Sequence, residues 1–178
     1  DLAGNTSSCV ATVEVIDDIA PVITCGPGDG LTTVTEDFES TTGSTPPAGW
    51  SNDIVVGDWD WKFGSGTMPN SDAFPTNAAI FDDDAAGAGN TNGATLTSPT
   101  YDLSAASVES ASFSYDYSLD ELGAETLIVS AWDGSAWAQI ALYDTDVIPP
   151  TNSGPMDVSS LMNADFKMPW ENRPDNSN

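Results

Sequence analysis

The feature that most constrains the fold is the way short apolar stretches are interrupted. From residue 33 onward they are separated by Gly, Asn, Pro and Asp, and no segment keeps a helical period of 3.6 residues for three turns. Residues 112–117 alternate instead, which places Phe113, Tyr115 and Tyr117 on one face of a strand. Strands at roughly twelve-residue intervals predict an all-β protein with two packed antiparallel sheets. The expected strands are residues 33–38, 59–63, 78–81, 94–97, 110–117, 126–132, 136–142 and 164–168.

The connections also divide the chain. Asp133-Gly134 predicts a tight hairpin turn, and residues 40–58 and 82–93 are expected to be long loops. The Gly-Pro-Gly-Asp-Gly run at 26–30 is a linker by composition. We therefore predict three parts, which are a terminal strand and linker over residues 1–25, a main domain over residues 26–168, and an irregular tail over residues 169–178.

Charge excludes several partners. The chain has 28 acidic residues against 3 basic ones, a formal net charge of −25. Nucleic acid binding is excluded because it depends on Lys and Arg neutralising phosphates. No apolar run reaches the ~20 residues that span a bilayer, so we expect no membrane insertion. A composition rich in Asp, Asn, Thr, Ser and Gly favours a secreted or cell-surface protein, and a strand-like start favours a piece of a longer chain with neighbouring domains.

The first 25 residues carry one resemblance. The text DLAGNTSSCVATVEVIDDIAPVITC contains an Asp-x-Ala-Gly-Asn-Thr turn, a Cys, an alternating strand and a Pro-Val-Ile-x-Cys linker. It resembles the end of a hyalin-repeat domain, an immunoglobulin-like extracellular module. Cys9 and Cys25 could pair with each other by count alone. The resemblance implies instead that Cys9 belongs with an upstream partner.

The main domain carries a second resemblance. The segments EDFESTTGSTPPAGWSNDIVVGDWDW, AIFDDDAAG, ATLTSPTYDLS and SFSYDYS follow one another between residues 34 and 168. In this order they resemble MAM-type jelly-roll domains and the jelly-roll adhesion modules of secreted and surface bacterial proteins. The resemblance implies an extracellular jelly roll that serves cell adhesion or accompanies a larger secreted protein.

Catalysis is disfavoured by composition. The chain has no His, so Ser-His-Asp and Cys-His mechanisms are excluded and zinc loses its commonest neutral ligand. Paired carboxylates could still hydrolyse glycosides. The acidic residues are mostly adjacent in expected loops, however, so we predict that the chain is not an enzyme.

Calcium is the expected ion, because it is bound by six to eight oxygen ligands in irregular geometry. Asp82, Asp83 and Asp84 precede a loop rich in Gly and Asn, and a bound cation would relieve their mutual repulsion. Solvated loop carboxylates are the alternative interpretation. The candidate ligands are Glu39, Asp58, Asp60, Asp82, Asp83, Asp84, Asn92 and Asp116.

Aromatic side chains make glycan binding a hypothesis, since ring faces stack on sugar C–H surfaces. The alternative is that these rings form the core. The candidate ligand-binding residues are Trp50, Trp59, Trp61, Trp132 and Trp137. Three functions remain open: a calcium-braced module that binds glycan or a partner surface, a structural spacer of a large adhesin, and a carbohydrate-binding accessory module of a secreted hydrolase.

Overall fold

The structure is a computed structural model that describes residues 32–65, 74–82, 85, 87, 91–120 and 125–174. The chain divides into two compact units, Asp1–Thr33 and Val34–Asn178. The predicted terminal strand over residues 1–25, its linker, Cys9 and Cys25 all lie outside the described residues. In the described part of the second unit, no helix is long and apolar enough to cross a bilayer.

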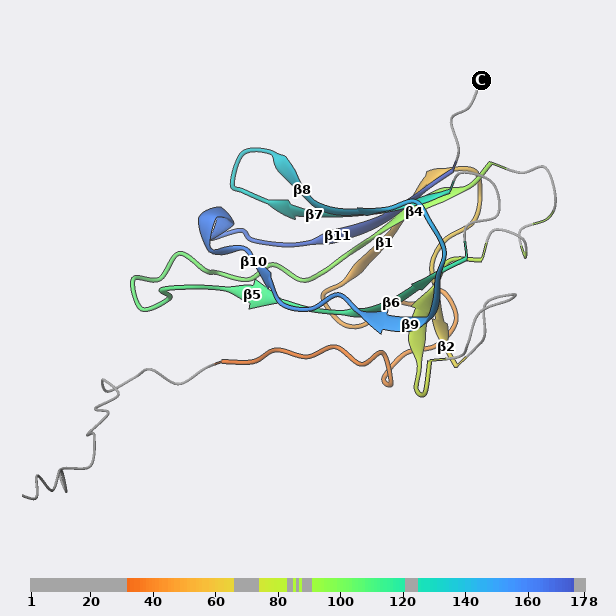
Figure 1. Cartoon of the computed structure of the whole chain (residues 1–178), viewed down its shortest axis with the longest axis horizontal. Coiled ribbons are helices and arrows are strands. Elements are labelled where there is room, and N and C mark those ends of the chain that lie inside the picture. The colour runs from red at the N-terminus through yellow and green to blue at the C-terminus, as the bar shows by residue number, and fades with distance from the viewer. Residues whose placement is uncertain are drawn as a thin grey trace, which may run out of the picture. The chain divides into compact units, whose positions relative to one another are not determined.

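A five-stranded antiparallel sheet forms one layer of this second unit (Figure 1). Its strands lie side by side in the order β1, β4, β11, β7, β8. Strand β11 is central and bonds to β4 on one side and to β7 on the other. The bounds are β1 (Ser51–Val56), β4 (Gly93–Thr97), β11 (Pro169–Arg173), β7 (Thr126–Trp132) and β8 (Trp137–Tyr143).

The facing layer consists of three antiparallel pairs, two of which continue one another. Strands β5 (Ser112–Phe113) and β6 (Asp116–Leu119) pair with β10 (Met156–Asp157) and β9 (Val147–Asn152) respectively. Ser153 joins the two pairs, because its N–H donates to the Tyr115 carbonyl at 2.8 Å and its hydroxyl accepts the Tyr115 N–H at 3.0 Å. The third pair is β2 (Lys62–Gly64) with β3 (Ala78–Ile80). The 3-10 turn η2 (Ser159–Leu161) follows β10.

The hairpin between β7 and β8 shows how local sequence sets the turn. The Asp133 carboxylate accepts the N–H groups of Ser135 and Ala136, both at 2.7 Å. Gly134 has a φ of +98°, a conformation that costs a residue without a side chain little. The predicted Asp133-Gly134 turn is therefore confirmed.

The core lies between the layers in two clusters. One contains Trp61, Phe63, Phe81, Ala94, Leu96 and Leu127, and the other contains Ala131, Val158, Phe166 and Met168. Trp170 of β11 packs against both clusters. The prediction of an all-β antiparallel sandwich is confirmed.

Several local predictions were wrong. Residues 33–38 form no strand, and Phe38 has a φ of +58°, which is incompatible with an extended run. The expected loop over residues 40–58 contains β1, and the expected strand over 164–168 is reduced to a single bridge between Phe166 and Tyr101.

The expected irregular tail is the largest correction, because its residues 169–173 form the central strand β11. These residues show no period in the sequence, and their leading proline is tolerated because it is the first residue of the strand. Strand β9 was missed for a similar reason: its two prolines fit a strand that pairs on one side with β6.

Candidate functional site

A cleft of about 500 Å³ opens between the two layers. The five-stranded sheet contributes Leu96 of β4, Leu127 of β7 and Trp170 with Asn172 of β11. The facing side comes from residues 74–81 and 113–120. Trp170 and Asn172 share a face because they are two residues apart on one strand, and this face is turned into the cleft.

Aromatic rings form much of the cleft wall. Trp50 lies between Phe38 and Trp170, with ring centroids 5.6 Å and 5.7 Å apart. Trp170 also meets Tyr115 edge to face at 5.8 Å, and Tyr115 contacts Tyr117 at 5.7 Å. These rings come from four segments of the chain, so the wall exists only in the folded protein.

Tyr115 is fixed within this wall by a second hydroxyl. Its hydroxyl oxygen lies 2.7 Å from that of Tyr143, and the Tyr143 ring lies 4.1 Å from that of Tyr117. Burial, followed by the hydrogen bond to Tyr143, raises the pKa of Tyr115 well above its ordinary value. The wall therefore presents neutral phenol groups at physiological pH.

Carboxylates also line the cleft. The acidic residues that line it are Glu36, Asp37, Asp116, Asp120 and Glu125. None of the chain's three basic residues is among the described lining residues. The potential in the cleft is therefore negative, and the Glu36 charge contributes, after burial, to a raised pKa of Tyr101 on its wall.

Two oxygens on the cleft residues are buried and accept no hydrogen bond within the described part of the chain. One is Oδ1 of Asn172, a residue that is only 6% exposed, and the other is Oδ2 of Asp120. An unpartnered buried acceptor costs roughly 1–3 kcal/mol, so such groups usually find a donor. Both oxygens have almost no accessible surface, so the donor of a molecule in the cleft reaches them only where adjacent side chains move aside.

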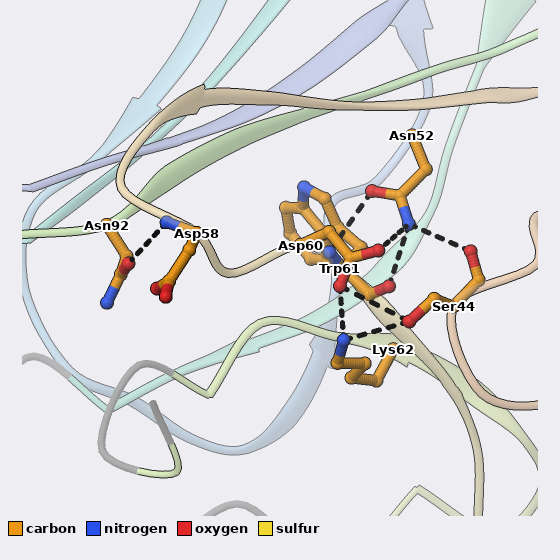
Figure 2. A network of polar contacts seen from close by, with 7 residues as sticks. All are labelled: Ser44, Asn52, Asp58, Asp60, Trp61, Lys62 and Asn92. Carbon is orange, nitrogen blue, oxygen red and sulfur yellow. Dashed lines mark hydrogen bonds and ion pairs between the residues drawn. The ribbon is translucent and has the colours of Figure 1, made fainter. Parts of the chain in front are cut away.

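A polar network holds Trp61, one of the residues that line the cleft, in place (Figure 2). The Asn52 side chain accepts the Trp61 N–H at 3.1 Å and donates to the Trp61 carbonyl at 2.8 Å, as a neighbouring strand would. The Trp61 indole N–H donates to the Ala94 carbonyl at 3.2 Å. The Asp60 carboxylate accepts from Asn52 at 3.2 Å and forms an ion pair with Lys62. Asp60 thus supports the wall.

The predicted calcium ligands that the structure describes do not form one group. Glu39 accepts the Asn77 N–H at 2.7 Å, Asp60 holds Lys62, and Asp116 accepts from Asn152 at 2.6 Å. Across the described ranges no three acidic, Cys or His side chains gather as a metal site. Asp83 and Asp84 lie outside these ranges.

Asp58 and Asn92 are brought together. The Asp58 N–H donates to Asn92 Oδ1 at 3.3 Å, which joins the end of the 82–92 segment to the turn after β1 (Figure 2). Gly57 allows this approach, because a Cβ there would collide with the Asn92 side chain and the Thr91 carbonyl. Asp82 caps its own turn by accepting the Ala85 N–H at 3.1 Å.

The five predicted tryptophans separate into three environments. Trp50 and Trp61 line the cleft, and Trp61 is at the same time a buried member of the core. Trp59 packs against the core beneath Lys62, whose Nζ lies 4.4 Å from the ring centroid. Trp132 and Trp137 form a pair with centroids 5.1 Å apart beside the β7–β8 turn, and Trp137 is 49% exposed.

Trp170, Asn172 and Asp120 were not among the site residues predicted from the sequence. The alternation of Trp170 and Asn172 across Glu171 was the available signal, and two flanking prolines obscured it.

Comparison with protein-family models finds no match, and comparisons with curated proteins and with solved structures find none either.

Proposed function

We propose that this chain is a non-catalytic extracellular binding module that holds a glycan in the cleft between its two layers. The observation that carries the proposal is the wall of Trp50, Tyr115, Tyr117 and Trp170 around a space of about 500 Å³. Flat rings beside hydrogen-bonding groups suit a pyranose, whose C–H faces stack while its hydroxyl groups bond. The order of motifs that resembles extracellular jelly-roll adhesion modules supports the same function.

The absence of a catalytic role rests on the chemistry of the side chains. The chain has no His to act as a base, and the carboxylates of Glu36, Asp37 and Asp116 on the cleft are engaged in hydrogen bonds with backbone or amide groups. Turnover of a polysaccharide by the purified protein, abolished by one Asp or Glu substitution, would contradict this part of the proposal.

Calcium has a bracing role in this proposal. Asp82, Asp83 and Asp84 would hold the ion, and the exposed Asp58 beside the end of the same segment offers a further carboxylate. Oxygen donors of this kind suit calcium, whereas Asp60 does not fit because it already balances Lys62. The bound ion would supply positive charge that reduces repulsion in a chain of net charge −25.

A glycan array tests the binding function. The wild-type protein and Trp50→Ala are applied with calcium and with a chelator, and Trp137→Ala serves as the matched control because it removes an indole outside the cleft. We expect binding that Trp50→Ala abolishes and Trp137→Ala preserves. Absence of binding by the folded wild type to every glycan would favour the spacer of a large adhesin. Loss of binding in Trp137→Ala alone would move the site away from the cleft.

A further inference from the structure

The cleft combines three properties that together define what it can bind. Its rings accept an apolar face, its charged lining residues are all acidic, and two of its buried acceptors find no donor among the residues that the structure describes. Aromatic faces also attract cations, because the ring quadrupole is negative above the ring. A ligand that fits all three properties carries hydrogen-bond donors, a stacking face and a positive charge.

The buried acceptors are the most selective of these features. Asn172 Oδ1 lies on the central strand beside Leu127 and Ala94, its neighbours in the sheet register, and both of these residues are themselves buried. This amide oxygen can accept a hydrogen bond from a neutral donor or from a charged one. Asp120 Oδ2 is a carboxylate oxygen, and a cationic donor adds the attraction of opposite charges to its hydrogen bond. Asn172 therefore suits a hydroxyl group and Asp120 suits an ammonium group.

The basic residues of the chain do not make the cleft a site for an anion. Lys62 is paired with Asp60, Arg173 is paired with Glu171, and the Lys167 Nζ lies 5.6 Å from the Trp137 ring centroid, outside the cleft. The carboxylate of an acidic sugar would lie in a negative cleft with no basic side chain of the protein to pair with it. The repulsion and the loss of hydration would weaken binding.

We propose that the cleft selects an amino sugar, a pyranose whose protonated amine faces Asp120 and whose hydroxyl group donates to Asn172. The inference rests on the proposed glycan-binding function and adds the charge of the ligand. Neutral sugars keep the stacking and the Asn172 contact but lose the ion pair. Uronic acids meet repulsion.

Titration calorimetry with three β-1,4-linked trimers tests this selectivity in the intact chain. The probes are the trimers of glucosamine, glucose and glucuronic acid, measured below the pKa of the sugar amine and at low ionic strength. We expect the glucosamine trimer to bind about tenfold more tightly than the glucose trimer, as one charge-assisted hydrogen bond would give. This preference should shrink as salt is added.

Two variants assign the contacts. Asp120→Asn keeps the shape of the side chain and should equalise the affinities for the glucosamine and glucose trimers. Asn172→Leu should weaken both equally. Asp53→Asn is the matched charge control: Asp53 is exposed and pairs with Thr95, so it lies on the outer face of the sheet, and its replacement should leave the preference unchanged.

The outcomes separate the two proposals. Equal binding of the glucosamine and glucose trimers, or a preference that survives Asp120→Asn, would overturn the amino-sugar inference and leave glycan binding standing. Tight binding of the glucuronic acid trimer would overturn it as well. Failure of all three trimers, together with an empty glycan array, would overturn the proposed function itself.

Discussion

Replacing Trp170 by alanine should destabilise the protein severely, because this side chain joins the two core clusters from the central strand. A Trp→Ala change in a core costs about 3–5 kcal/mol. Trp170 is partly exposed, which lowers this cost. The alanine variant also loses the ring pairs with Trp50 and Tyr115, however, and each pair is worth roughly 1 kcal/mol. We therefore expect a loss of about 4 kcal/mol, a large share of the ~5–15 kcal/mol that stabilises a typical domain.

Trp137→Ala provides the control for the same chemical change. Trp137 is 49% exposed and has one ring partner, Trp132, so its loss should cost about 1 kcal/mol. Urea unfolding followed by far-UV circular dichroism measures both variants without depending on tryptophan emission. Equal midpoints for the two variants would refute the placement of residues 169–173 at the centre of the sheet.

Three further predictions concern the turns, the carboxylates and the ion. Gly57→Ala should destabilise more than Gly43→Ala: both positions have positive φ, but only Gly57 would place its Cβ against neighbouring atoms, and thermal unfolding compares them. Hydrogen bonds from Ala136 and Ser135 lower the folded-state pKa of Asp133, so its stabilising contribution is complete above its unfolded pKa and is lost as pH falls through the folded value. The stability difference between the wild type and Asp133→Ala should therefore shrink on acidification, and a constant difference in urea unfolding would contradict this. Calcium should raise the melting temperature relative to chelator at equal ionic strength, and coincident melting curves would contradict the bracing role of the ion.

The sequence predicted those strands whose pattern is local. Residues 126–132 carry a run of β-branched and apolar side chains followed by a clear turn, and the observed β7 has the same bounds. Strand β11 could not be found in this way. Its five residues include two charged side chains and begin with proline, and its extended form depends on hydrogen bonds from β4 and β7 on both sides. Such pairing is tertiary and leaves little trace in a short segment.

The sequence predicted which kind of side chain the candidate site contains, but it did not predict which residues form the site. The abundance of tryptophan predicted rings for stacking on sugars, and Trp50 and Trp61 do line the cleft. The sequence could not distinguish them from Trp59, which packs against the same core cluster beneath Lys62 and does not line the cleft. The role of Asp60 depends on the position of Lys62 and Asn52, which only folding determines.

The central claim is that a glycan binds between the layers, and tryptophan indole N–H signals in NMR spectra test it most directly. The protein would be titrated with the tightest-binding oligosaccharide from the array, with signals assigned from single Trp→Phe variants. We predict shifts for Trp50, Trp61 and Trp170, whose rings line the cleft, and an unmoved signal for the exposed Trp137. Shifts confined to Trp132 and Trp137 would place the ligand beside the β7–β8 turn and contradict binding between the layers.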